Sequence, residues 1–279
     1  MAEARPVTEA LAWHGEGPVW WQDVLVWVDM LAGDVLSMDA GGQVTRAHVG
    51  SVAAALRPRR SGGWVLATER GFALTEELGG PITSLGPLWI DDGIRMNDGG
   101  CDPDGRFYCG SMAYDARAGA GALFRLAPDR GVERVLGGVT ISNGFAFSPD
   151  GATAYYVDTP TGRIDAFDYT GADGLTGRRE FAKVEPPGQP DGITVDAEGG
   201  VWVALWGGSA VRRYDRDGVL DAVIELPVSQ VTACTFGGPG RTTLFITTSQ
   251  QDAAPDHRAG AVFAAEPGVA GLPALTFAG

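Results

Sequence analysis

The sequence is short of positive charge and has no long apolar run. Lys and Arg together number 21 against 35 Asp and Glu, which gives a formal net charge of −14. Phosphate backbones and anionic lipids repel so acidic a chain, so we expect neither a nucleic-acid nor a membrane partner. No stretch approaches the ~20 apolar residues of a membrane span. The first residues show no basic segment followed by an apolar core, so we expect no signal peptide.

Cysteine is too scarce to build a disulfide framework. The chain has three cysteines, an odd number: Cys101, Cys109 and Cys234. Cys101 and Cys109 flank one turn, where a bridge between them would be strained. A chain without a secretory leader or a disulfide framework is expected to be cytoplasmic.

Glycine, in contrast, is abundant. It makes up 42 of 279 residues, well above the usual ~7%, which predicts many turns and argues against long helices. Six times along the chain a turn leads into a short apolar or alternating run, as in DPDGRFYCGSM from Asp102 and SPDGATAYYVDT from Ser148. Each unit is followed by a second strand-like motif, such as GRIDAFD from Gly162. A β-repeat of roughly 40–50 residues is typical of one four-stranded propeller blade.

We therefore predict an all-β fold: a six-bladed β-propeller with four-stranded antiparallel blades around a central channel. It is predicted to form a single domain over residues 1–279. The alternative is a β-sandwich with accidental regularity. In a propeller the innermost strand of each blade lines the channel, so the residues that begin these strands point into the same mouth.

Counting back seven residues from each turn compares the same position in all blades. At four of the six positions the side chain carries oxygen: Glu16, Asn97, Asn143 and Asp191. The other two positions fall near Ala54–Ala55 and Thr232. Gly or Asp-Gly follows each of the four oxygen-bearing residues, which lets the backbone bend closely there. The alternative interpretation treats the four as turn-forming residues that cap strand entries.

Carboxylates that converge on one point repel each other, and a divalent cation relieves that repulsion. A donor set made only of oxygen, with two negative charges, favours Ca2+, Mg2+ or Mn2+. The three histidines (His14, His48 and His257) fall outside this register. A zinc site of the nitrogen and sulfur type is therefore not indicated, although Zn2+ also accepts oxygen ligands.

Four segments carry a family resemblance: GEGPVW, RMNDGGCDPDGRFYCGSM, SNGFAFSPDG and PDGITVDAEGGVWVALW. Over nearly the whole chain the sequence resembles the senescence-marker-protein/gluconolactonase family, also called regucalcin-like. Members of that family are six-bladed propellers that open sugar lactones with one divalent cation in the channel. The resemblance implies that Glu16, Asn143 and Asp191 are the metal ligands.

The resemblance also implies roles for neighbouring residues. Asn97 matches the family's substrate or metal shell, and Arg95 and Asp98 match its substrate-contacting and acid/base neighbourhood. The family often has Glu three residues after the Gly-Ser/Thr-Met motif. Here that position is Asp115, one methylene shorter, and it is the implied substrate contact.

Lactone hydrolysis needs an activated water and neutralisation of charge on the carbonyl oxygen, and one metal ion supplies both. A carboxylate beside the metal collects the proton; Asp191 is the first choice for base and ligand, and Asp98 the second. Arg95 would hold a ring hydroxyl or the developing anion. We expect a gluconolactonase-like hydrolase using Ca2+, with Zn2+, Mn2+, Mg2+ and Fe2+ as alternative ions.

Two rival functions stay open. The first is hydrolysis of other lactones or of phosphotriesters on the same scaffold. The second is a cation-binding propeller without catalysis, whose mark is metal binding with no turnover of any lactone. A metal-free propeller lyase fits less well, because it has no need of four oxygen ligands in register.

Overall fold

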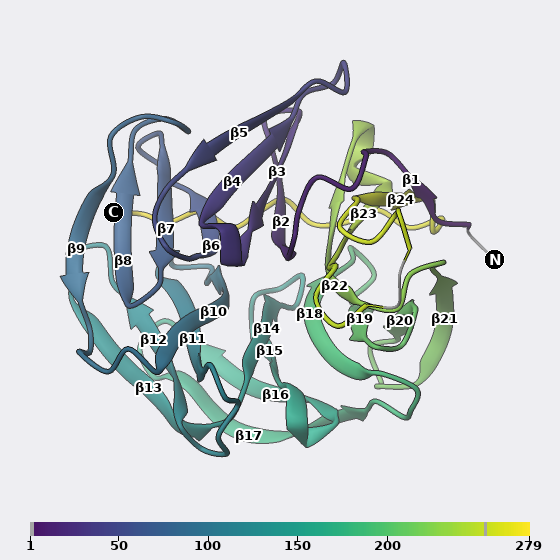
Figure 1. Ribbon diagram of the computed structural model, residues 1–279. Coiled ribbons are helices and arrows are strands. Elements are labelled where there is room, and N and C mark those ends of the chain that lie inside the picture. The colour runs from purple at the N-terminus through teal and green to yellow at the C-terminus, as the bar shows by residue number, and fades with distance from the viewer. Residues whose placement is uncertain (1–2, 254–255) are drawn as a thin grey trace.

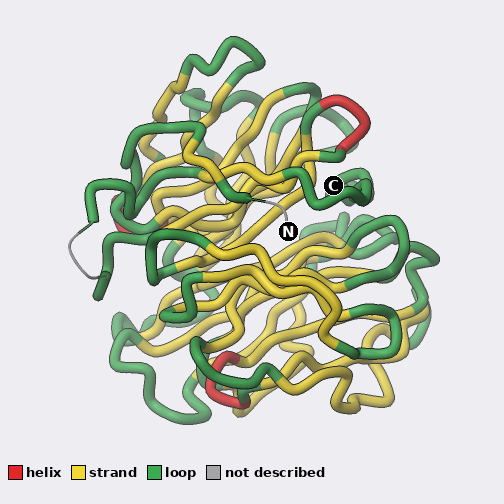
Figure 2. The backbone as a smooth tube through the Cα atoms, turned by 90° about the vertical axis from the view of Figure 1, so that its right-hand side faces the viewer, coloured by secondary structure: helices red, strands yellow, loops and turns green. Residues whose placement is uncertain are grey.

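The strands of this protein form six four-stranded antiparallel sheets arranged around a central channel (Figure 1). The computed structural model describes residues 3–253 and 256–279. Within them, helix is limited to three 3-10 turns, at Met30–Ala32, Thr159–Thr161 and Pro239–Arg241. A side view shows strands crossing the whole molecule, with loops at both ends (Figure 2). The prediction of a six-bladed propeller is confirmed.

Five blades follow the chain from the channel outward, and the sixth draws on both ends of the chain. The innermost strands are β2 (Gly15–Trp21), β6 (Ala53–Pro58), β10 (Ile94–Cys101), β14 (Ser142–Phe147), β18 (Gln189–Val195) and β22 (Val231–Gly237). The second strands are β3 (Val24–Asp29), β7 (Trp64–Thr68), β11 (Phe107–Ala113), β15 (Thr153–Asp158), β19 (Val201–Trp206) and β23 (Thr243–Thr248). The third strands are β4 (Asp34–Met38), β8 (Gly71–Thr75), β12 (Gly121–Leu126), β16 (Arg163–Thr170), β20 (Ala210–Tyr214) and β24 (Phe263–Ala265). The outermost strands are β5 (Val44–His48), β9 (Thr83–Pro87), β13 (Val132–Val139), β17 (Gly174–Lys183), β21 (Leu220–Glu225) and β1 (Arg5–Pro6).

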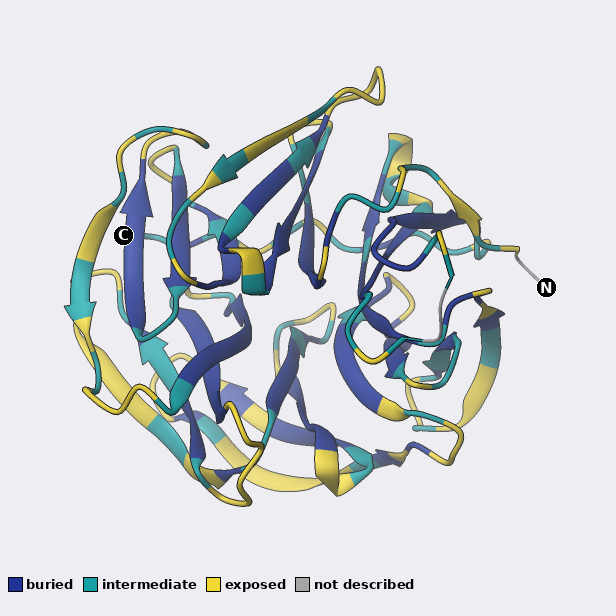
Figure 3. Cartoon of the chain, in the orientation of Figure 1, coloured by how far each residue is buried: buried dark blue, intermediate teal, exposed yellow. Residues whose placement is uncertain are grey.

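The second strands are apolar on both faces because each blade packs between two others. β19, with the sequence VWVALW, is buried along nearly its whole length. The largest fully buried side chains include Trp27, Trp202, Tyr108 and Tyr156, all on second strands. Burial falls toward the outermost strands, which Figure 3 shows largely in the colours of intermediate and exposed residues. The core therefore lies between blades and leaves the channel wall free for polar residues.

The sixth blade closes the ring with the two ends of the chain. β1 pairs with β24, so an N-terminal strand completes a sheet made otherwise of C-terminal strands. The last residues then cross beneath the channel toward the second blade, as the yellow segment of Figure 1 shows. There Phe277 is fully buried and exchanges backbone hydrogen bonds with Pro58 and Arg60. We call residues 271–279 the C-terminal strap.

Every innermost strand carries a bulge at the same register. Its pairing with the second strand slips at Glu16/Val19, Ala53/Ala55, Met96/Gly99, Ser142/Phe145, Pro190/Ile193 and Val231/Ala233. A bulge re-aims the side chains of the residues that leave the ladder. The register positions predicted from the sequence lie within five of these bulges, and Glu16 borders the sixth. The repeated bulge is thus what gives the channel wall one common level.

Glycine at the bulge lets neighbouring innermost strands approach each other. A Cβ atom on Gly144 would lie 2.7 Å from the backbone nitrogen of Ile193 in the next blade. One on Gly192 would lie 2.5 Å from Cβ of Ala233, again one blade further on. Any side chain at these positions would push the blades apart, so the glycines that follow the candidate ligands determine how narrow the channel is.

The three cysteines are buried and free. Across the β10–β11 ladder, Cys101 faces Phe107 and Cys109 faces Gly99, so the two thiols are not opposite one another. Among the described residues no helix is long and apolar enough to cross a membrane.

Candidate active site

Two buried carboxylates and one buried amide occupy the common level of the channel wall. Glu16 on β2, Asn143 on β14 and Asp191 on β18 are each 3–5% exposed. They come from the first, fourth and fifth blades and are brought together only by the ring. Of the other register positions, Asn97 is equally buried, whereas Ala54 and Thr232 add no charge.

The surroundings of Glu16 and Asp191 disfavour the charged form of both carboxyl groups. Burial raises the pKa of Glu16 well above its usual range, and the charges of Asp191 and Asp98 raise it further. Burial likewise raises the pKa of Asp191, with a further rise from Asp98. The backbone N–H of Gly17 donates to Glu16 Oε2 at 2.8 Å, which satisfies one oxygen. The charge of Arg95 lowers the pKa of both groups but does not offset the rise, and a divalent cation would balance the two carboxylates.

The amide of Asn143 is engaged through its nitrogen and leaves its oxygen without a partner. Its Nδ2 donates to Thr159 Oγ1 at 3.0 Å, and that hydroxyl donates to the carbonyl of Pro190 at 2.9 Å. Because the Thr159 proton is used on Pro190, Thr159 can only accept from Asn143, which fixes the orientation of the amide. The oxygen of Asn143 is buried and has no hydrogen-bond partner in the protein. A buried amide oxygen without a donor fits the demands of a hard cation.

Asn97 occupies the same register but is fully engaged. Its Oδ1 accepts from Arg95 Nη1 at 2.7 Å, and its Nδ2 donates to the carbonyl of Ser142 at 2.8 Å. Arg95 is itself buried, and its guanidinium lies 5.7 Å from the ring centre of Tyr114. The two residues form a donor-rich wall on one side of the mouth, suited to oxygen atoms of a ligand.

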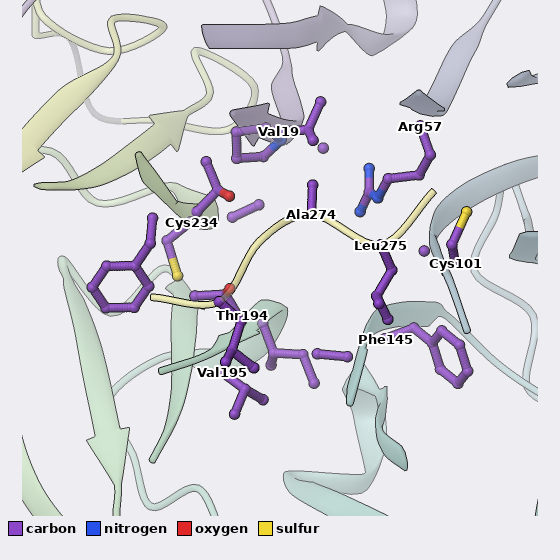
Figure 4. Close-up of a pocket in the computed structure, with 18 of the residues that line it drawn as sticks. Val19, Arg57, Cys101, Phe145, Thr194, Val195, Cys234, Ala274 and Leu275 are labelled. Atoms are coloured by element: carbon purple, nitrogen blue, oxygen red, sulfur yellow. The ribbon is translucent and has the colours of Figure 1, made fainter. Parts of the chain in front are cut away.

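Asp98 lies close enough to Glu16 and Asp191 for its charge to raise the pKa of both, and it also borders a cavity. This cavity, of about 120 Å3, lies beneath the common level and is also lined by Arg57. Figure 4 shows this cavity, with Ala274 and Leu275 of the C-terminal strap running across it. Burial raises the pKa of Asp98, whereas Arg57 and the Gly99 N–H, which donates to Asp98 Oδ1 at 2.6 Å, hold that rise back. The strap covers this end of the channel, and the innermost strands begin at the opposite end.

Asp115 lies outside this buried group. It follows β11 on an exposed turn, where its carboxylate accepts the N–H of Arg117 at 3.2 Å. Six of the seven predicted site residues are therefore buried, and Asp115 alone among them lies at the surface. Among the described residues, no three His, Cys, Asp or Glu side chains form a cluster fit for a metal. The candidate centre instead combines two carboxylates with an amide.

Two contributors escaped the sequence reasoning. Thr159 lies in a 3-10 turn after β15 and carries no signal of its own, yet it orients Asn143. His14 falls outside the predicted register, although it precedes Glu16 by the same two residues as Arg95 precedes Asn97. That spacing was the available signal. Burial, with a smaller contribution from the charge of Arg95, lowers the pKa of His14 to about 3.

The fold and the site together define the class of this protein: a six-bladed β-propeller with buried carboxylates and an amide lining its channel. The chain belongs to the SMP-30/gluconolactonase/LRE-like family, whose model matches residues 14–250. It is 34% identical to regucalcin of Danio rerio over 281 residues, which covers 95% of each chain. It is 35% identical to pentonolactonase XacC of Haloferax volcanii over 246 residues, 85% of this chain and 82% of the other. Among solved structures, the calcium-binding protein regucalcin from Agrobacterium tumefaciens superimposes with a TM-score of 0.92 at 29% identity, covering 99% of this chain and 97% of that one.

Proposed function

We propose that this protein hydrolyses sugar lactones to aldonic acids with one divalent metal ion in its channel. The observation that carries the proposal is the partnerless, buried oxygen of Asn143 at the level of two buried carboxylates. Family membership and the resemblance to a pentonolactonase support the reaction class. A relative described as a calcium-binding protein supports Ca2+ as the first ion to test.

In this proposal Glu16, Asn143 and Asp191 hold the ion. When bound, a divalent ion supplies Lewis acidity, which stabilises negative charge that develops on oxygen. Arg95 donates to an oxygen of the substrate, while Asn97 holds the guanidinium in place through the 2.7 Å contact. These residues orient the lactone with its carbonyl toward the carboxylate–amide level.

Asp98 is the proposed proton acceptor. A carboxylate that binds a cation loses basicity, so Asp191 suits the ligand role and Asp98 the role of base. The oxygen of the attacking water bonds to the carbonyl carbon, and the ring C–O bond breaks. Asp98 takes the proton from that water and returns it to the departing ring oxygen, so that atoms and charge balance. The product is the open hydroxy acid.

The test uses protein stripped of metal with a chelator. Ions are added back one at a time, and acid release from a polyhydroxylated lactone is followed with a pH indicator. We expect turnover only with an ion present, and neither binding nor turnover in Glu16→Gln. Calorimetry that shows Ca2+ binding without turnover of any lactone would favour the cation-binding alternative, which the description of the Agrobacterium relative also suits. Turnover confined to a phosphotriester would change the substrate class.

A further inference from the structure

A second level of residues lies one step nearer the mouth than the candidate ligands. In extended chain, residues two apart point to the same side. Arg95 stands two residues before Asn97, and His14 stands two residues before Glu16. Both are buried polar residues; Arg95 lies on β10, and His14 directly precedes β2. The two come from the third and first blades.

Contacts place His14 and Arg95 in one neighbourhood. Arg95 Nη1 lies 3.1 Å from Sδ of Met30, so the guanidinium reaches across the second blade to the first. The backbone N–H of Met30 in turn donates to the carbonyl of His14 at 2.9 Å. Arg95 and His14 therefore lie in one neighbourhood, close enough for the charge of Arg95 to lower the pKa of the imidazole.

The imidazole of His14 is held on two sides. Its Nδ1 lies 2.8 Å from Ser249 Oγ, and its ring packs edge-on against Trp206, with centroids 5.7 Å apart. Ser249 Oγ also donates to the carbonyl of Trp13 at 3.2 Å and accepts the N–H of Gln251 at 3.0 Å. The arrangement that uses all three contacts has the proton on Nδ1, so that Nε2 carries a lone pair.

The other ring nitrogen of His14, Nε2, does not take part in these contacts. Among the described residues it makes no hydrogen bond, although His14 as a whole is only 7% exposed. We propose that His14 is a substrate-recognition residue whose Nε2 accepts a hydrogen bond from a hydroxyl group of the substrate, opposite the donors of Arg95. This inference rests on the proposed lactonase function and adds that the site prefers lactones with a free ring hydroxyl.

The test compares His14→Phe with His14→Gln. Phe keeps a ring beside Trp206 but removes the acceptor, whereas Gln can offer its amide oxygen near the position of Nε2. For each variant, kcat/KM is measured on a polyhydroxylated lactone and on the unsubstituted lactone of the same ring size. We expect the preference for the hydroxylated lactone to fall about tenfold in His14→Phe and to be largely retained in His14→Gln.

The matched control is His48→Phe. His48 is an exposed histidine on the outermost strand β5, where its Nδ1 lies 2.7 Å from Asp34 Oδ1. It should leave the preference unchanged. Melting temperatures establish whether each variant is folded. If His14→Phe does not fold, Ser249→Ala takes its place, because it removes the partner of Nδ1 and leaves Nε2 unchanged. Ser249→Ala should weaken the preference because the ring loses its anchor.

A spectroscopic measurement tests the tautomer independently of activity. Nitrogen-15 NMR of the wild type, with the His14 signals assigned by their loss in His14→Gln, should show the proton on Nδ1. A proton on Nε2 would overturn the acceptor role. An unchanged preference in a folded His14→Phe, or equal losses on both lactones, would overturn the inference while the lactonase function stands. Failure of the wild type to open either lactone would overturn both.

Discussion

Thr159 connects the two candidate ligands Asn143 and Asp191 through one hydroxyl group. It accepts from Asn143 Nδ2 at 3.0 Å and donates at 2.9 Å to the carbonyl of Pro190, the residue before Asp191. The hydroxyl is buried, so water cannot easily replace it. A residue from the turn after β15 thereby sets the geometry of donors on two different blades.

Replacing Thr159 by Val should weaken metal binding by about 10- to 100-fold, the usual cost of losing a partner that orients a ligand. Thr159→Ser is the matched control, because it retains the hydroxyl. Isothermal titration of both variants with the same ion measures the difference. Wild-type affinity in a folded Thr159→Val would show that Asn143 needs no such support.

Asn143→Ala should cost far more metal affinity than Asn97→Ala, although both asparagines share one register. The oxygen of Asn143 has no partner, whereas both ends of the Asn97 amide are bonded to Arg95 and Ser142. Titrating the two variants in parallel makes each the control for the other. Equal losses would mean that Asn97 also contacts the ion directly.

Arg95→Lys should keep metal binding and lower kcat/KM by roughly 10- to 100-fold, as expected when a contact to the transition state is lost. Lys lacks the planar set of donors that Arg95 uses to contact Asn97 and still face the entrance. Kinetics on a polyhydroxylated and a plain lactone should show the larger penalty on the former. Equal penalties on both would remove Arg95 from hydroxyl recognition.

The three thiols should be unreactive in the native protein. All are buried and free, and burial raises the pKa of Cys101, Cys109 and Cys234, which suppresses the reactive thiolate. Ellman's reagent at mildly alkaline pH should label less than one thiol before denaturant is added and all three afterwards. Fast labelling of the native protein would contradict the buried placement.

Phe277→Ala should destabilise the protein by about 3–5 kcal/mol, the range for removing a buried aromatic ring. Phe277 is fully buried and anchors the C-terminal strap, whereas Leu275 on the same strap is 37% exposed. Leu275→Ala should therefore cost much less. Urea unfolding of the two variants measures both losses, and similar values would show that the strap contributes little.

The blade count and the common register follow from the sequence alone. Turn residues and alternating strands are local signals, and six copies in constant order reinforce one another. Counting back from the turns therefore predicts Glu16, Asn97, Asn143 and Asp191 from the sequence alone. The repeated bulge, found at every innermost strand, is the local feature that makes this count meaningful.

The pairing of β1 with β24 and the course of the strap could not be predicted in the same way. β1 is two residues long and carries no pattern, and its partner lies at the other end of the chain. Such pairing is decided when the ring closes, because only then do the two ends meet. The same holds for Phe277, whose partners Pro58 and Arg60 belong to the second blade and its turn.

The sequence determines which residue types reach the channel, and the tertiary structure decides which of their atoms are free. Asn97 and Asn143 look alike in the sequence, and both begin an innermost strand. Arg95 and Ser142 bond both ends of the first amide, while Thr159 accepts from the second and leaves its oxygen without a partner. These partners include residues of neighbouring blades and a turn after a second strand. Because hydrogen bonds between distant segments leave no periodic trace in the sequence, only the folded ring distinguishes the asparagine whose amide oxygen is bonded from the one whose oxygen has no partner.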